Sequence, residues 1–167
     1  MIIRPERQGD EEAIGALTEA AFRDMPFSDQ TEHLIVGRLR NADALTISLV
    51  AEDGGHIVGH VAFSPVTVSD SEGRWFALGP ISVSPERQGQ GIGSRLVHEG
   101  LSMLDRLEAA GCILAGSPAY YGRFGFERFD GLHSKGIPDK YLLALRLHGG
   151  TPSGIVGFHP GFDSVNA

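Results

Sequence analysis

The sequence predicts a single domain of the α/β (α+β) class, built on a mixed but mostly antiparallel sheet. Two amphipathic helices open the chain, three β-rich runs joined by short turns follow, and a glycine-rich turn leads into a long helix and a further apolar run. Strands joined by short turns pair antiparallel, whereas two strands joined through a helix pair parallel. The chain has 167 residues, of which 41% are hydrophobic, which is enough for one sizeable core.

The opening segment predicts one short strand and two helices. A strand at 2–4 precedes a helix at 11–22, whose apolar residues recur at helical spacing. Asp10 stands directly before this helix and is of a type that caps helix N-termini. A second helix is expected from about 28 to 41, with Glu32 in its first turn.

The middle of the chain predicts three strands, at 45–52, 56–69 and 75–83, because these runs are rich in residues that favour β-structure. Turn-forming residues separate them at 53–55 and 70–73. Short connections of this kind favour an antiparallel meander.

The second half predicts a parallel crossover followed by shorter elements. Apolar residues repeat at helical spacing from 92 to 107, Gly111 ends that helix, and 112–116 is an apolar strand. The remaining elements are expected to be a helical turn at 119–124, a strand from Phe126 and a strand at 141–147.

The domain is expected to cover residues 1–148, followed by a tail at 149–167. The tail is rich in glycine and proline. It therefore offers at most a short edge strand or a surface strap at 155–158.

The charge balance and the cysteine content exclude several classes of protein. Lys and Arg total 14 against 21 Asp and Glu, a net charge of −7, so nucleic acid and anionic membranes are not expected partners. The single cysteine, Cys112, lies in an apolar run, which excludes a disulfide framework or cysteine-based zinc site and predicts a buried thiol. The N-terminus lacks a signal-peptide pattern, and no apolar run approaches the ~20 residues that span a bilayer. A cytoplasmic location is therefore expected.

Three glycines, at 89, 91 and 93, lie between an apolar strand and an amphipathic helix. Such a turn exposes several backbone N–H groups at a helix N-terminus with little side-chain obstruction, which favours the binding of an anion. Turns of this kind also occur for steric reasons alone, so the neighbouring residues have to decide between the two interpretations.

Two familiar phosphate-binding patterns do not fit this turn. A P-loop needs Gly-Lys followed by Ser or Thr, but Gly93 is followed by Ser94 and Arg95. A dinucleotide-binding fold has Gly-x-Gly-x-x-Gly after the first strand of a parallel sheet. This turn reads Gly-x-Gly-x-Gly and follows an antiparallel meander, so a nucleoside triphosphatase and a Rossmann fold are disfavoured.

The stretch 78–93 resembles the acetyl-CoA motif of the GNAT N-acetyltransferase superfamily. Its Gln/Arg-x-x-Gly-x-Gly signature is met by Gln88, Gly91 and Gly93. A second stretch, 120–126, resembles the Tyr-x-x-x-Gly-Phe element of the same superfamily. The resemblance is strongest between these two motifs, extends in the order of elements over most of the domain, and is greatest to a bacterial group of predicted acetyltransferases.

The resemblance implies a GNAT fold with a parallel β-α-β crossover at the cofactor site, and acetyl-CoA as the cofactor. Backbone amides of 88–93 would hold the pyrophosphate, and main-chain groups of 81–83 would pair with the pantetheine arm. Many members carry Asn shortly after the fifth strand, whereas this chain has Gly-Ser-Pro-Ala at 116–119. The cofactor-binding residues implied are Ile81, Ser82, Val83, Arg87, Gln88, Gly89, Gln90, Gly91, Ile92, Gly93, Ser94 and Tyr121.

Acetyl transfer to an amine sets two chemical requirements. An alkyl amine with a pKa near 10.4 is about 99.9% protonated at pH 7, so a base or a water chain has to remove a proton. The resemblance makes Tyr121 the candidate acid for the leaving thiol, with packing beside Phe124 and Phe126 as the alternative. A main-chain amide of Ser82 or Val83 would stabilise the charge on the thioester oxygen.

The sequence leaves the base open. Glu32 and His33 lie on the helix that borders the acceptor cleft in GNAT proteins, and His60 lies in a strand that can approach the thioester. His60 has a suitable intrinsic pKa and Glu32 could attract a cationic amine, although each has an ordinary packed or solvated role as its alternative. A water chain without a single base is a further alternative.

The sequence therefore predicts an N-acetyltransferase that moves the acetyl group of acetyl-CoA to a primary amine of a small molecule or peptide by direct attack in a ternary complex. The alternative is a non-catalytic acyl-CoA-binding sensor or regulatory module. A metal or phosphate hydrolase is disfavoured, because the sequence shows no clustered His and carboxylate signature. Dimers are common among GNAT proteins, so a homodimer is an open expectation.

Overall fold

The computed structural model describes residues 1–163, which divide into two units. The first unit comprises Met1–Ser64, Gly79–Gly100 and the described residues from Pro160 onward, and the second comprises Pro65–Leu78 and Leu101–His159. Three elements contribute residues to both units, namely β3 (His56–Val68), β4 (Trp75–Val83) and α3 (Ile92–Arg106).

In the first unit the strands follow the order β1-β2-β3-β4. Strand β1 (Ile2–Pro5) pairs antiparallel with β2 (Ile47–Asp53), which pairs antiparallel with β3 and places Val50 opposite His60. The register shifts by one residue between Ala51 and Glu52. Such a bulge bends a strand locally and increases its twist.

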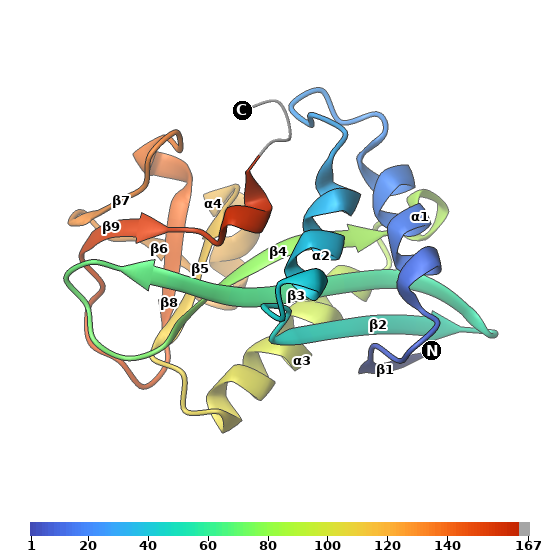
Figure 1. Cartoon of the computed structure of the whole chain (residues 1–167), viewed down its shortest axis with the longest axis horizontal. Helices are drawn as coiled ribbons and strands as arrows, with labels where there is room; N and C mark the ends of the chain where they lie inside the picture. The colour runs from blue at the N-terminus through green and yellow to red at the C-terminus, as the bar shows by residue number, and fades with distance from the viewer. Residues whose placement is uncertain (164–167) are drawn as a thin grey trace. The chain divides into compact units, whose positions relative to one another are not determined.

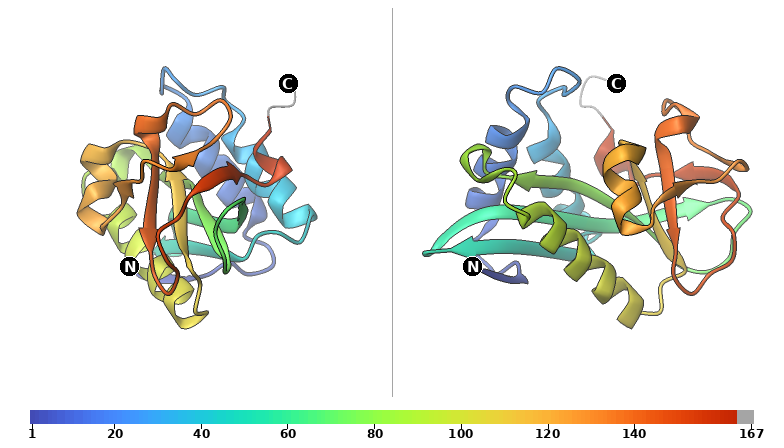
Figure 2. Two further views of the ribbon diagram at one scale, coloured as in Figure 1. Left: turned by 90° about the vertical axis from the view of Figure 1, so that its left-hand side faces the viewer. Right: turned by 180° about the vertical axis from the view of Figure 1, so that it is seen from behind.

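Two helices cover one face of this sheet. Helices α1 (Glu11–Phe22) and α2 (Glu32–Asn41) lie side by side in Figures 1 and 2. Ile14 of α1 and Val36 of α2 are buried against Val50 of β2 in one apolar cluster. The helical spacing of apolar residues read from the sequence thus corresponds to the buried faces of both helices.

Helix α3 approaches the other face of β3 at two glycines. A Cβ atom on Gly100 would lie 2.2 Å from Cε2 of Phe63, and one on Gly59 would lie 2.9 Å from Cγ2 of Ile92. Gly59 and Phe63 point away from the face that carries His60, since side chains alternate along a strand. The absence of a side chain at these two positions, above all at Gly100, therefore lets the helix pack this closely.

In the second unit, β4 pairs parallel with β5 (Gly111–Ala115), and β5 pairs antiparallel with β8 (Leu142–Arg146). Strand β8 also pairs with β6 (Glu127–Arg128), and the short helix α4 (Pro118–Tyr121) follows β5. Strand β9 (Gly154–Gly157) runs antiparallel to β3 and parallel to β7 (Leu132–His133). Residues of the predicted tail therefore form a strand with a partner on each side, β3 and β7, rather than a strand at the edge of the sheet.

These elements confirm the predicted mixed, mostly antiparallel sheet and the parallel crossover pair β4–β5. The parallel pairing of β7 with β9 was not predicted. The bounds of α1 and β4 agree with the predicted 11–22 and 75–83. Cys112, predicted to be interior, is 0% exposed.

The prediction for the start of the second helix was wrong by four residues. Helix α2 begins at Glu32 rather than near Ser28. The Ser28 hydroxyl donates to the Glu32 carboxylate at 2.7 Å, and Gln30 adopts a φ of 65°, which a right-handed helix cannot contain. Asp10 occupies the N-cap position of α1, but its carboxylate binds Arg4 at 2.8 Å instead of capping the helix.

Other boundaries moved for similar local reasons. Helix α3 ends at Arg106, because Glu108 turns to a φ of 57°, and Gly111 is instead the first residue of β5. The predicted strand at 141–147 begins at Leu142, since Asp139–Tyr141 forms a 3-10 turn. The two-residue strand β7 was not predicted, because so short a segment has no periodicity to read.

No helix in residues 1–163 combines the length and apolarity required to cross a bilayer.

Candidate functional site

The glycine turn before α3 is shaped as an open cradle. Gly89 and Gly91 have φ angles of +78° and +84°, a region that side-chain-bearing residues rarely adopt. A Cβ atom built on either residue would meet no atom within 4 Å, so it would project into open space. The structure therefore places the least obstructed backbone of this turn where the helix begins.

The amides of this turn are available to a ligand because the first backbone hydrogen bond of the helix begins only after them. The Arg95 amide donates to the Gly91 carbonyl at 3.1 Å. The N–H groups of Ile92, Gly93 and Ser94 precede that bond, and the first amides of a helix have no intrahelical acceptor. These donors lie at the positive end of the α3 macrodipole.

The segment that joins β4 to the cradle is held by its own hydrogen bonds. The Arg87 amide donates to the Ser84 carbonyl at 2.8 Å within the 3-10 turn Pro85–Arg87. The Gln88 side-chain amide donates to the Val83 carbonyl at 3.2 Å. The entry to the cradle is thus fixed by local contacts.

Arg87 is braced by a residue that the sequence did not single out. Its guanidinium lies 2.9 Å from an Asp53 carboxylate oxygen and donates through Nε to the Gln90 side chain at 3.0 Å. The hydrogen bond from Arg87 lowers the pKa of Asp53 below its ordinary value. Asp53 stands at the end of β2, far from the turn in sequence, so no local pattern could have revealed this contact.

The predicted pantetheine-binding segment alternates along β4. Ser82 is 2% exposed, and its buried hydroxyl has no hydrogen-bond partner among the described residues. Ile81 and Val83, on either side, are partly exposed. This alternation is that of a regular strand. The groups of this segment that can bind a ligand are therefore mainly main-chain N–H and C=O groups.

Tyr121, the predicted acid, lies at the end of α4 in the second unit. Its ring meets that of Tyr120 edge to face at a centroid distance of 4.9 Å, and that of Phe126 at 6.1 Å. Burial, with smaller contributions from Tyr120 and Cys112, raises the pKa of Tyr121 to about 12. The phenol therefore keeps its proton at neutral pH, as a hydrogen-bond donor must.

Gly116 makes room for the Tyr121 ring. A Cβ atom on Gly116 would lie 2.6 Å from Cε2 of Tyr121, closer than any real Cβ contact. The Gly116 amide donates to the Tyr141 carbonyl at 2.9 Å, which fixes the backbone at this point. No sequence pattern pointed to this role.

Glu32 and His33 lie in the first turn of α2, in the first unit. The Glu32 carboxylate accepts the Ser28 hydroxyl, and His33 Nε2 lies 3.6 Å from a carboxylate oxygen of Glu19. Both side chains are partly exposed. Glu32 is thus an oriented carboxylate at a helix N-terminus.

His60 is completely enclosed, at 0% exposure. Its Nε2 lies 2.8 Å from the Ser48 hydroxyl, which donates to the Glu6 carboxylate at 2.7 Å, and Arg40 donates two hydrogen bonds to the same carboxylate. Since a carboxylate only accepts, the Ser48 proton points to Glu6, and His60 Nε2 is the atom that carries a proton. Burial lowers the pKa of His60 to about 4, so this imidazole is neutral at pH 7 and packed inside the sheet.

The predicted site residues therefore fall into two groups. The cradle, the β4 segment, Glu32 and His60 belong to the first unit, and Tyr121 belongs to the second. No group of three or more His, Cys, Asp or Glu suited to a metal ion occurs within residues 1–163.

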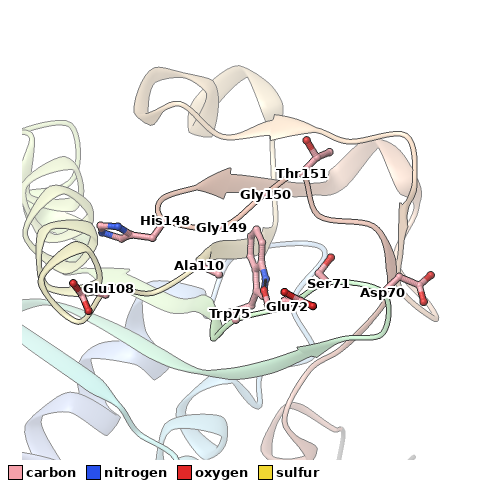
Figure 3. A pocket seen from close by; sticks show the side chains of 11 residues that line it. Asp70, Ser71, Glu72, Trp75, Glu108, Ala110, His148, Gly149, Gly150 and Thr151 are labelled. Carbon is pink, nitrogen blue, oxygen red and sulfur yellow. Dashed lines mark hydrogen bonds between the residues drawn. The ribbon is translucent and has the colours of Figure 1, made fainter.

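A separate hollow of about 490 Å³ lies within the second unit (Figure 3). The turn before β4, the segment after α3 and the segment after β8 form its walls, and Trp75 stands among them with its indole N–H donating to the Glu72 carbonyl at 3.1 Å. None of the residues that line this hollow was predicted to take part in binding or catalysis.

The fold and the cradle define the class of protein. Residues 14–126 match the family model described as the acetyltransferase (GNAT) family. This match covers more than half of the chain, so the chain belongs to the GNAT acetyltransferase family, as the two sequence motifs predicted.

Among individual proteins, the chain is similar to the uncharacterized N-acetyltransferase YhbS of Escherichia coli strain K12, with 39% identity over 76% of this chain and 74% of that protein. It is also similar to YjhQ of the same strain, another uncharacterized N-acetyltransferase, with 31% identity over 80% of this chain and 74% of YjhQ.

Two solved structures share both sequence and fold with this chain. A GNAT family acetyltransferase from Brucella melitensis, in complex with acetyl-CoA, is 46% identical, has a TM-score of 0.86 and is covered over 97% of each chain. The structure of YhbS from Escherichia coli, in complex with CoA, is 33% identical, has a TM-score of 0.87, and is covered over 98% of this chain and 92% of that one.

Proposed function

We propose that this chain transfers the acetyl group of acetyl-CoA to a primary amine of a small molecule or peptide. The observation that carries the proposal is the open glycine cradle at the start of α3, in a chain that belongs to the GNAT family. Family members of similar sequence and fold bind acetyl-CoA or CoA in their structures, which supports the same ligand here.

The cradle fits a diphosphate. The space beside Gly89 and Gly91 is free of protein atoms, so an anion can reach the backbone there. Amides of residues 88–93 would donate to it, and each favourable contact of an anion with a helix N-terminus contributes about 0.3–1 kcal/mol, or up to about 2 when partly buried. Ser94 adds a further amide and hydroxyl at the same helix end.

Bound acetyl-CoA supplies a thioester carbonyl carbon that a neutral amine can attack. The residues of this chain would then contribute at two points. A main-chain amide of Ser82 or Val83 would donate to the carbonyl oxygen as negative charge develops on it. Tyr121, which keeps its proton because its pKa is raised to about 12, would donate to the leaving sulfur.

Glu32 is the residue we assign to the acceptor. A partly exposed carboxylate attracts an ammonium ion, and the hydrogen bond from Ser28 orients it. His60 is a poor direct base, because it is fully enclosed and its pKa is lowered to about 4. Removal of the amine proton through a water chain therefore fits this site better than transfer to the imidazole.

The proposal is tested with the purified protein, coenzyme A and a panel of amines. Calorimetry should show binding of acetyl-CoA, and thiol release should accelerate in the presence of at least one amine class. Binding without thiol release for any acceptor would instead support a non-catalytic acyl-CoA sensor. If neither acetyl-CoA nor CoA binds, both the transferase and the sensor function are excluded.

A further inference from the structure

The end of the described chain is fastened to helix α2. Arg38 of α2 donates through Nη1 to the Gly161 carbonyl at 3.2 Å and to the Asp163 carbonyl at 2.6 Å. Residues 160–163, here called the C-terminal strap, include the 3-10 turn Pro160–Phe162, in which Gly161 is buried. The strap and α2 both belong to the first unit.

Helix α2 depends on such contacts for its position. It has 10 residues, and Val36 and Leu39 are the ones it buries. A helix this short is marginal in water without tertiary contacts. Near its C-terminal end it is held on two sides, by Arg38 on the strap 123 and 125 residues away and by Arg40 on Glu6, 34 residues away.

The other end of the same helix carries the acceptor-facing candidates. Glu32 and His33 lie in its first turn. Glu32 lies six residues before Arg38, which is about 9 Å along the axis at a rise of about 1.5 Å per residue. Because helix formation is cooperative, loss of the contact at Arg38 also loosens the first turn of the helix. The strap is therefore placed to control where these side chains stand.

We infer that Arg38 is a positioning residue, which holds the C-terminal strap against α2 and thereby sets the affinity for the amine acceptor. The inference rests on the proposed function, in which Glu32 attracts the acceptor. It assigns Arg38 and the strap no contact with acetyl-CoA.

The test compares three variants with the full chain, namely Arg38→Gln, a chain that ends at His159, and the two changes together. Each single change should raise the acceptor KM about 10-fold and leave kcat and the acetyl-CoA affinity within about twofold. The combined variant should be no worse than the shortened chain alone, because the Arg38 contact is already lost in that chain. Additive losses, or a fall in kcat without a change in KM, would overturn the inference.

Two substitutions serve as matched controls. Arg38→Lys keeps a cationic donor and should recover most of the acceptor affinity. Arg40→Gln removes the same charge from the same helix but leaves the strap bonded, so its effect should add to that of ending the chain at His159. The acceptor KM of each substitution is therefore also measured in the shortened chain. If both substitutions add to the effect of shortening, or if neither does, the contact between Arg38 and the strap has no special role.

Amide hydrogen exchange gives a readout that needs no substrate. The α2 amides should exchange at least about 10-fold faster in Arg38→Gln and in the shortened chain, while circular dichroism confirms that both are folded. Unchanged exchange would overturn the inference even if transfer is measured. If the α2 amides exchange faster as expected but the unaltered protein transfers acetyl to no amine, the proposed function is overturned. The strap then only stabilises α2.

Discussion

Tyr121 was identified from its place in a motif, and most of its surroundings lie in the same stretch of the chain. Edge-to-face contacts with Tyr120 and Phe126 hold the ring, and the missing side chain of Gly116 gives it space. The motif could not show that burial raises the pKa of this phenol to about 12. That value suits a group that donates its proton rather than one that titrates near neutral pH.

Tyr121→Phe should lower kcat by about 100-fold or more, because the variant keeps the ring and loses only the proton donor. Acetyl-CoA affinity, measured by calorimetry, should hold. The neighbouring Tyr120→Phe makes the same chemical change beside it and should leave kcat within about threefold. Unchanged turnover in Tyr121→Phe would remove the acid role and leave a packing role.

Gly116→Ala should displace the Tyr121 ring, because the new methyl group would occupy the space that the ring now fills. The new Cβ would lie 2.6 Å from Tyr121 Cε2, and overpacking of this kind costs about 1–3 kcal/mol of stability. We expect a lower denaturation midpoint in urea and a kcat reduced about 10-fold by the shifted ring. Gly122→Ala, a few residues on, meets no atom within 4 Å and should change neither quantity. Equal behaviour of the two variants would contradict the contact.

Among the elements, the turn from β4 into α3 is the one whose structure follows most directly from contiguous residues. Its positive φ angles at Gly89 and Gly91 are those that glycine permits. By contrast, α2 starts at Glu32 rather than near Ser28 because of a side-chain hydrogen bond between these two residues and a left-handed Gln30. The same residue types are typical of a helix N-terminus in either register, so the sequence could not choose between them.

Gly91→Val should abolish most of the affinity for CoA while the protein stays folded. The substitution strains a backbone at φ +84° and projects a branched side chain into the open cradle. We expect Kd to rise at least 10-fold by calorimetry. Gly136→Val is the matched control, since Gly136 has a φ of +81° and open space around it but lies in the turn between Ser134 and Ile137, in the second unit. An equal loss of affinity in both variants would point to general strain instead of the cradle.

Across the whole molecule, the buried His60 couples folding to pH. Its pKa is lowered from an ordinary 6.5 to about 4, chiefly by burial, so the folded state resists protonation more than the unfolded chain does. Its stabilising contribution is therefore complete above about pH 6.5 and is lost as the pH falls from there towards 4. A shift of this size corresponds to about 3 kcal/mol.

Urea unfolding between pH 7 and pH 4 measures this loss. His60 should account for about 3 kcal/mol of the fall in the free energy of unfolding over that range in the unaltered chain. Carboxylates whose pKa values are lowered in the folded state, such as Glu6 and Asp10, add to the fall. His60→Gln should be less stable at pH 7 and show a much shallower dependence between pH 6.5 and 4. His56→Gln, at an exposed position of the same strand, should keep the original slope. A slope that His60→Gln does not change would assign the acid sensitivity to other groups.

The sequence by itself determined the order of elements, the parallel crossover and the glycine cradle, and with them the family. These features depend on periodicity, turn chemistry and the backbone of contiguous residues, all of which are local. Only the tertiary structure decided that Asp53 braces Arg87, that Gly116 makes room for Tyr121, that His60 is sealed from solvent and that Arg38 holds the C-terminal strap. Each of these depends on how the chain packs, because folding brings the groups together, and even the short spacing between Gly116 and Tyr121 does not by itself encode their contact.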